Sequence, residues 1–244
     1  MADKMTLEQR IRQNIDRIEE RIETACQNSG RKRGEIQLMG VTKFHGIEAA
    51  ETAFKAGLTL FGESRVQEAK EKFSRFYELH ARDSAALHLI GSLQRNKAKI
   101  AASFFDCIQS VDRDSLINEL GALTSERESP LMIMLEYHTG EESKAGFPNL
   151  DSLFRAAENV FSFSGLKPAG LMTMAPFTDD TTLIRSSFKA LVKARDELEK
   201  RFPLERKPGW SCLSMGMTGD LEIAVEEGST LLRIGTAIFG ERET

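Results

Sequence analysis

Hydrophobic residues recur along the chain with two spacings, which alternate from one segment to the next. Residues 7–27 show the clearest helical spacing, because Ile11, Ile15, Ile18 and Ile22 lie three or four positions apart with charged residues between them. Ser29 and Gly30 then predict the end of this helix. After it, short apolar runs typical of buried strands alternate with segments of helical spacing.

The apolar runs predict eight strands, over 36–42, 58–61, 87–90, 104–108, 131–136, 169–174, 210–215 and 230–234. The segments between them predict helices over 46–56, 65–79, 94–102, 114–124, 150–161, 181–201 and 218–227. Strands that alternate with helices pair in parallel through crossover connections. Eight such units predict an α/β fold, a single (β/α)8 TIM-type barrel with an extra N-terminal helix over 7–27.

A doubly wound open sheet is the competing fold, because it alternates in the same way. Such a sheet usually carries a GxGxxG fingerprint after its first strand, and the segment KFHGIEAAE that follows the first apolar run lacks one. No proline- or serine-rich linker divides the sequence. We therefore expect one barrel domain over residues 1–244.

Composition narrows the functional classes. The 244 residues are 41% hydrophobic and 29% charged with a net charge of −4, which is typical of a globular protein and argues against nucleic acid as a partner. No apolar run is long enough to span a membrane, and MADKMTLEQR lacks a signal-peptide core. Three separated cysteines suit reduced thiols, so we expect a cytoplasmic protein. The histidines lack metal-ligand spacing, and we predict no metal site.

The first apolar run, LMGVTKFHG (38–46), ends on Lys43, the only lysine among the eight predicted strand ends. Reactive groups of a barrel lie at the C-terminal ends of its strands. A lysine at a strand end is commonly a solvated surface cation. The functional alternative is an amine that projects into the barrel mouth and forms a Schiff base with a carbonyl compound.

The loops after the last two predicted strands, LSMGMTGDLE (213–222) and LLRIGTAIFG (231–240), suit an anion. Glycine allows close approach, hydroxyls donate, and helix N-termini present free N–H groups, although Asp220 competes for them. Phosphate often binds here in such barrels, and we expect the site to lie opposite Lys43. A ligand with a carbonyl group at one end and a phosphate at the other would reach from Lys43 to the phosphate site. Pyridoxal 5′-phosphate (PLP) and the sugar phosphate of an aldolase are both ligands of this kind.

Arg233 lies inside the last apolar run. It either forms a salt bridge at the strand end or donates to a ring nitrogen of the ligand. Because arginine keeps its proton, a pyridine nitrogen facing it would stay unprotonated, and the ring would be a weaker electron sink.

These residues belong to longer blocks. The chain resembles the pyridoxal-phosphate homeostasis protein family, single-domain barrels similar to the N-terminal domain of alanine racemase. The resemblance covers nearly the whole chain in seven ordered blocks: LMGVTKFHG, LFGESRVQEAKEK, LHLIGSLQRNKAK, GEESKAGF, GLMTMAP, LSMGMTGDLEIAVEEGST and RIGTAIFGER.

The resemblance implies a role for each candidate residue. Lys43 matches the lysine that carries PLP as a Schiff base, and Arg233 matches the residue that faces the pyridine nitrogen. The phosphate-holding loops are matched by Ser214, Met215, Gly216, Gly235 and Thr236. Family members commonly read FGEN where this chain has FGES, so Ser64 takes the place of an asparagine and reaches less far toward the cofactor.

The function implied is PLP homeostasis by a monomer that carries the cofactor, delivers it to PLP-dependent apo-enzymes and has little or no catalytic activity. A PLP-dependent amino-acid racemase is the alternative. It needs a second acid–base group, which alanine racemase-like enzymes take as a tyrosine from an added domain of the partner subunit, and we expect this chain to lack that domain. A Schiff-base aldolase acting on sugar phosphates is the third possibility, with Glu63, Glu136 or Tyr137 as its base.

Overall fold

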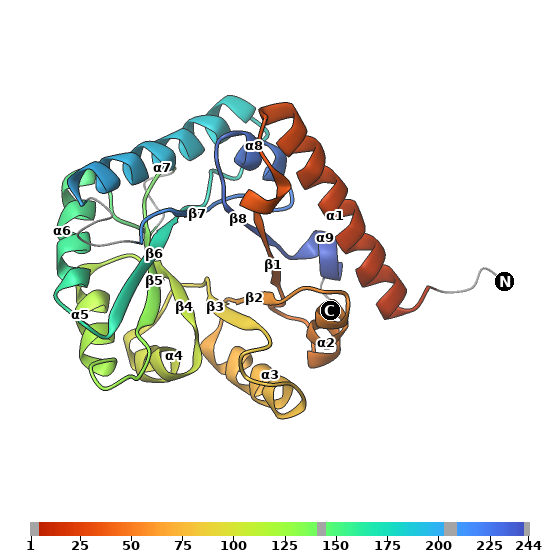
Figure 1. Cartoon of the computed structure of the whole chain (residues 1–244), viewed down its shortest axis with the longest axis horizontal. Helices are drawn as coiled ribbons and strands as arrows, with labels where there is room; N and C mark the ends of the chain where they lie inside the picture. Colours follow the sequence, from red (N-terminus) through yellow and green to blue (C-terminus); the bar gives the residue numbers. More distant parts are fainter. Residues whose placement is uncertain (1–4, 141–144, 203–208, 242–244) are drawn as a thin grey trace.

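The computed structural model describes residues 5–140, 145–202 and 209–241. Over these ranges, eight parallel strands close into a barrel in the order β1 to β8 (Figure 1). The strands are β1 (Gln37–Val41), β2 (Leu60–Glu63), β3 (Ala86–Leu89), β4 (Cys107–Val111), β5 (Leu131–Glu136), β6 (Leu166–Met172), β7 (Cys212–Ser214) and β8 (Leu231–Ile234). The predicted (β/α)8 barrel is confirmed.

Helices surround the barrel in the expected alternation (Figure 1). They are α1 (Leu7–Ser29), α2 (Ile47–Lys55), α3 (Val66–Leu79), α4 (Ala98–Phe104), α5 (Asp114–Leu123), α6 (Leu150–Phe161), α7 (Thr181–Arg201), α8 (Leu221–Glu226) and α9 (Thr236–Phe239), with short 3-10 turns at Arg33–Glu35 and Arg95–Lys97. None of the described helices is long and apolar enough to cross a lipid bilayer.

Two predicted strands are displaced from the observed ones. The run 104–108 predicted a strand that begins three residues later, because Phe104 ends α4 and Phe105 is buried beyond that end. The run 169–174 predicted a strand that in fact covers Leu166–Met172. In the first place, Phe105 serves the core without joining the sheet; in the second, the sheet begins three residues earlier than the run and Met174 beyond it is exposed.

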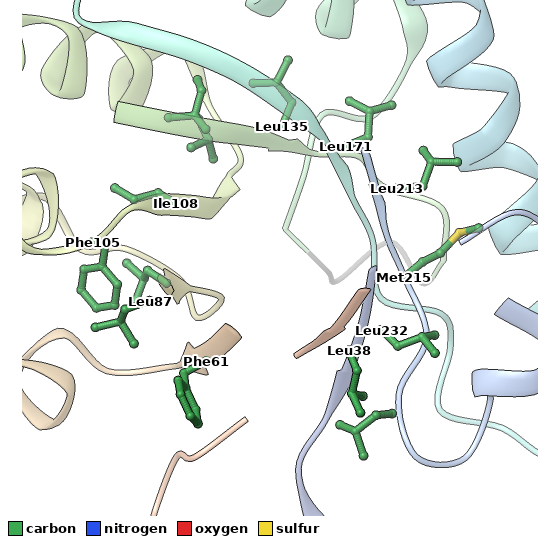
Figure 2. Packing of buried hydrophobic residues seen from close by; sticks show 14 of the residues in the cluster. Leu38, Phe61, Leu87, Phe105, Ile108, Leu135, Leu171, Leu213, Met215 and Leu232 are labelled. Atoms are coloured by element: carbon green, nitrogen blue, oxygen red, sulfur yellow. The ribbon is translucent and has the colours of Figure 1, made fainter. Parts of the chain in front are cut away.

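Alternate strand residues face opposite sides of the sheet, as the pleat requires. One set packs toward the helices in the main core; Figure 2 shows members of it from around the barrel, including Leu38, Phe61, Ile108, Leu171 and Leu232. The other set fills the lumen with a sulfur-rich cluster that includes Met39, Val41, Cys107, Met134, Met172 and Leu231. Strand positions in step with Met39 and Leu231 therefore face the lumen.

The extra helix α1 packs on the outside of the barrel against α2, α8 and α9 (Figure 1). Its isoleucine stripe is buried there, and Gly30 ends the helix in the left-handed conformation at φ 69°. Asn14 Nδ2 donates to the Ile238 carbonyl at 2.9 Å, and the Arg21 guanidinium donates to Glu222 at 2.7 Å and to the Thr218 carbonyl at 3.0 Å. The helix thus fastens the last units of the barrel to the first.

Candidate functional site

Lys43 lies two residues beyond the C-terminal end of β1. Met39 and Val41 of β1 face the lumen, and Lys43 follows them in the turn at the rim of the barrel. Its side chain is exposed, and no described residue forms an ion pair with it. The lysine therefore presents an accessible amine at the face where barrel enzymes place their chemistry.

The turn that follows β1 is held from α3. Phe44 has φ 68°, which is uncommon for a residue other than glycine, and its N–H donates to Glu68 Oε1 at 2.6 Å. Lys72 Nζ donates to the Thr42 carbonyl at 2.6 Å. The peptide groups on both sides of Lys43 are thus bound by side chains of one neighbouring helix.

Glu63 ends β2 on the outer face of the sheet, in step with Phe61. Its Oε1 accepts from Thr42 Oγ1 and from Lys72 Nζ, both at 2.7 Å. Burial raises the pKa of Glu63, and the nearby Lys72 cation opposes that rise. Because the carboxyl group points toward α3, Glu63 does not face the mouth, contrary to the expectation that it is available as an aldolase base.

The strand register brings Lys43 close to the last loop. β1 pairs with β8, with Met39 opposite Arg233 and Gly40 opposite Ile234. The Gly235-Thr236 turn and Lys43 therefore follow the ends of neighbouring strands. The sequence had suggested that they lie on opposite sides of the mouth, and this expectation was wrong. The N–H groups of Gly235 and Thr236 open α9, and no described residue accepts a hydrogen bond from them.

The loop after β7 is partly occupied by the protein itself. Gly216 has φ 98°, and a Cβ there would lie 2.5 Å from Ala224 Cβ, so packing alone requires glycine. Asp220 Oδ1 accepts from the Met217 N–H at 2.5 Å, which is the competition expected from this acid. The Met215 side chain is buried among the outer core residues, so only its backbone is left to contact a ligand.

Arg233 faces the lumen from β8 and is 5% exposed. It forms no salt bridge among the described residues. Its Nη1 donates to Ser214 O and Ser214 Oγ, both at 2.7 Å, and its Nη2 donates to Thr173 O at 2.8 Å. Three of its five donors are thus used within the protein. Burial lowers the pKa of Arg233 to about 10, so it remains a cation at neutral pH.

A line of hydrogen bonds continues from Arg233 across the lumen. Ser214 Oγ donates to Gln109 Oε1 at 2.6 Å, and Gln109 Nε2 lies 2.8 Å from His88 Nδ1. Since the Gln109 carbonyl accepts, its NH2 group donates, and His88 must be neutral. Burial lowers the pKa of His88 to about 4, in agreement with that direction.

This network adds two residues to the predicted set. Ser214 donates its hydroxyl proton to Gln109 in this structure, and its place in a phosphate-holding loop stays a prediction. The sequence reasoning missed Gln109 and His88. Each could have been found as a polar residue within an otherwise apolar strand, at a position that faces the lumen. His88 has this position in LHLI, and Gln109 has it in CIQSV.

Two further candidate residues lie at the C-terminal ends of strands. Glu136 ends β5 in step with Met134 and is 5% exposed; burial raises its pKa to about 7. Ser64 follows β2 and is half-buried, with its carbonyl packed against Gly91. Its cofactor contact stays a prediction. Residues 141–144 of the GEESKAGF block lie outside the described residues.

Comparison with known proteins identifies the family of this chain. Residues 9–243 match the family model described as alanine racemase, N-terminal domain. The pyridoxal phosphate homeostasis protein of Vibrio cholerae is 37% identical over 234 residues, 96% of this chain and 97% of that protein. The chain belongs to the pyridoxal phosphate homeostasis protein family. Family membership agrees with the resemblance of the seven sequence blocks.

Solved structures give the same fold. PipY of Synechococcus elongatus PCC7942, a structure described as having PLP bound, is 32% identical with a TM-score of 0.78, over 91% of this chain and all of that one. Alanine racemase of Clostridium difficile 630 has a TM-score of 0.75 at 11% identity, over 96% of this chain and 57% of that one. At that identity the racemase shares the barrel fold alone. In the described part of this chain, no group of three or more His, Cys, Asp or Glu residues is placed to hold a metal ion.

Proposed function

We propose that this member of the pyridoxal phosphate homeostasis protein family binds PLP as a Schiff base on Lys43 and takes part in intracellular PLP homeostasis. The observation that carries the proposal is Lys43 itself, an exposed amine without an ion-pair partner in the described chain, in the turn at the C-terminal rim of the barrel and next to the Gly235-Thr236 turn. The description of PipY, a family relative, as having PLP bound supports the same cofactor here.

The donors at the rim suit the three polar ends of PLP. The Lys43 amine would take the aldehyde carbon. The N–H groups of Gly235 and Thr236, with the Thr236 hydroxyl, would hold the phosphate, and the backbone of Met215 and Gly216 would contribute from the next loop. The unused donors of Arg233 would face the pyridine nitrogen. Asp220 limits the donors of the β7 loop, since it already binds the Met217 N–H.

Arg233 argues for storage over catalysis. Bound PLP supplies a pyridine ring that takes up electron density most strongly when its nitrogen is protonated. Arg233 stays cationic at neutral pH, so it donates a hydrogen bond and leaves the nitrogen without a proton of its own. We propose that this chain therefore has little or no catalytic activity.

The test is covalent trapping. We expect purified protein incubated with PLP to show a Schiff-base absorption band that borohydride removes, with the reduced adduct mapped to Lys43. Lys43→Ala should abolish that adduct. Lys99→Ala, a change of an exposed lysine on α4, should leave it unchanged. A reduced adduct that persists at full yield in Lys43→Ala would overturn the assignment.

We further propose that the chain is one PLP-binding domain that works as a cytoplasmic monomer and supplies PLP-dependent apo-enzymes. In support, α1 buries its isoleucine stripe on its own barrel and leaves none of it for a second copy. The thiols of Cys26, Cys107 and Cys212 are all free. Light scattering would give the mass in solution, and transfer of PLP to an apo-enzyme would be read from the recovery of that enzyme's activity.

Weak amino-acid racemisation is a second candidate, and Glu136 favours it. This carboxyl group is buried on the lumen side at the rim, and its pKa of about 7 suits proton transfer near neutral pH. If the activity exists, Glu136→Gln should abolish it and leave the adduct on Lys43. A wild-type protein loaded with PLP that exchanges no α-proton of amino acids into deuterated water would remove this candidate.

A further inference from the structure

The turn that carries Lys43 is held by three ionisable side chains that the proposed PLP site does not use. Glu63, Glu68 and Lys72, which we call the α3 brace, come from the end of β2 and from two successive turns of α3. Glu68 and Lys72 are four residues apart, so they share one face of the helix, and their charged atoms are 3.4 Å apart. The brace thus joins the second barrel unit to the loop of the first.

Its hydrogen bonds fall on both peptide groups that flank the lysine. Lys72 Nζ binds the Thr42 carbonyl, which precedes Lys43, and Glu68 Oε1 binds the Phe44 N–H, which follows it. The Arg65 guanidinium also lies over the Phe44 ring, 5.0 Å from its centroid. Lys43 therefore has both of its neighbours bound by side chains of α3, while its own side chain is exposed.

The conformation that results is one the turn does not favour by itself. Phe44 has φ 68°, a left-handed conformation in which the Cβ of a bulky residue meets the backbone. Such conformations persist where the surroundings impose them, and they concentrate at functional sites. A free turn would relax, and the direction in which the preceding residue points would change with it.

An ion pair such as that of the brace is not needed to stabilise the fold. Glu63 and Lys72 have side chains 0% and 6% exposed, and a buried ion pair of this kind is often no more stable than a well-packed apolar pair. One oxygen of the pair, Glu63 Oε2, is buried without a hydrogen-bond partner among the described residues. A role in orienting the turn accounts for this buried ion pair and its unpaired oxygen, which a role in stability alone does not explain.

We infer that the α3 brace is a set of positioning residues that aims the Lys43 amine at the site of covalent attachment. Glu68 and Lys72 fix the two flanking peptide groups, and Glu63 holds Lys72 and Thr42 in place. The inference rests on the proposed attachment of PLP to Lys43. It assigns no chemical step to the brace, which acts through Lys43.

Glu68→Ala tests the inference, because it removes the acceptor of the Phe44 N–H at a position where alanine suits the helix. Glu119→Ala is the matched control, since Glu119 and Glu68 side chains are both 26% exposed and both take part in helix-borne ion pairs. Glu68→Gln keeps a carbonyl acceptor and is the rescue variant. Thermal unfolding would report whether the two alanine variants are equally folded.

Two measurements are made on each variant. The first, without PLP, is hydrogen exchange of the Phe44 amide, which we expect to become about tenfold faster in Glu68→Ala. The second is the rate at which PLP becomes trapped on Lys43 by borohydride, which we expect to fall about tenfold to hundredfold, since misplacement of a reacting group by about 1 Å can have an effect of that size. Glu119→Ala and Glu68→Gln should stay within about threefold of wild type on both.

The outcomes separate the two claims. If wild-type protein traps no PLP on Lys43, the proposed function fails, and the inference fails with it. If wild type traps PLP and Glu68→Ala does so at the same rate, the inference alone is overturned. A slower rate in Glu68→Ala with equal thermal stability, restored in Glu68→Gln, supports positioning.

Discussion

Two sides of the barrel mouth are held in different ways. On the amine side, Thr42 and Phe44 of the turn are bound by the side chains of Glu63, Glu68 and Lys72, on the outer face of the sheet and within 30 residues of the turn. On the ring side, Arg233, Ser214, Gln109 and His88 form a line through the lumen that joins four strands, with one member 105 residues from the next. The amine side can form once two barrel units are folded, whereas the ring side requires the closed barrel.

The difference also concerns charge. Buried charges on the amine side stabilise each other only while all of them are present, so the loss of one should be costly. On the ring side, one cation is solvated by carbonyl and hydroxyl oxygens, and the rest of the line is neutral. That side should lose less stability than the amine side from a single change at neutral pH, and it should be sensitive to acid.

The largest effect should follow from Lys72→Met, which leaves Glu63 buried without its cation. We expect the free energy of unfolding to fall by about 3–5 kcal/mol, measured by urea denaturation at pH 7. Glu63→Gln in the same background should recover much of this loss, because no unpaired charge then remains. A single variant within about 1 kcal/mol of wild type would show that the amine side does not depend on its charges.

The next largest effect should be a loss of stability in acid that arises on the ring side, at His88. The pKa of His88 is lowered from 6.5 to about 4 by burial, so between these pH values the unfolded chain binds a proton that the folded protein excludes. Stability should therefore fall as pH falls from 6.5 to 4, by up to about 3 kcal/mol. Asn in place of His88 keeps an acceptor for Gln109 and does not titrate.

The measurement for His88 is the difference between wild type and His88→Asn in denaturant titrations from pH 7 to pH 4. Subtracting the two curves is necessary because Glu136 changes stability in the opposite direction. Its pKa is raised to about 7, so the stability that its protonated form contributes is lost as pH rises from 4.5 through 7. Glu136 is present in both proteins and cancels. Parallel curves for the two proteins would contradict a neutral His88.

A smaller effect is expected for Arg233→Gln. Thr173 O loses its buried donor, so the free energy of unfolding should fall by about 1–3 kcal/mol. After incubation with PLP, the absorption maximum should shift while the reducible adduct on Lys43 remains. An unchanged spectrum would place the ring nitrogen away from Arg233 and weaken the assignment of the ring side.

The smallest effect should come from Arg21→Ala, outside the mouth. The ion pair of Arg21 with Glu222 has side chains 36% and 42% exposed, and pairs of this kind contribute less than about 1 kcal/mol. Chemical denaturation should show a change of that size, with the rate of PLP trapping unaltered. A slower rate would mean that α1 shapes the β7 loop as well as covering it.

The barrel could be predicted from periodicity because each unit repeats the same two spacings, and the position of Lys43 followed from a single strand end. The lumen network could not. Whether Gln109 or His88 faces the lumen depends on strand register, and the prediction placed β4 about three residues too early. The α3 brace could not be predicted either, because the alternating charges of ESRVQEAKEKFSR are equally typical of a solvent-exposed helix face. Only folding shows that Lys72 is 6% exposed on its side chain.

Helix α1 has a consequence for the order in which the molecule is made. The hydrogen bond from Asn14 to Ile238 joins residues 224 positions apart, so α8 and α9 are synthesised long after the first helix that they cover, whereas α2 follows that helix directly. At about 5–20 residues per second, the isoleucine stripe waits roughly 10–45 s for α8 and α9 to emerge from the ribosome. Joining the two ends also carries the largest loop-closure entropy in the fold. The nascent chain therefore leaves part of the isoleucine stripe of α1 uncovered until α8 and α9 are made, and the stripe is fully buried only when these last units pack against the first helix.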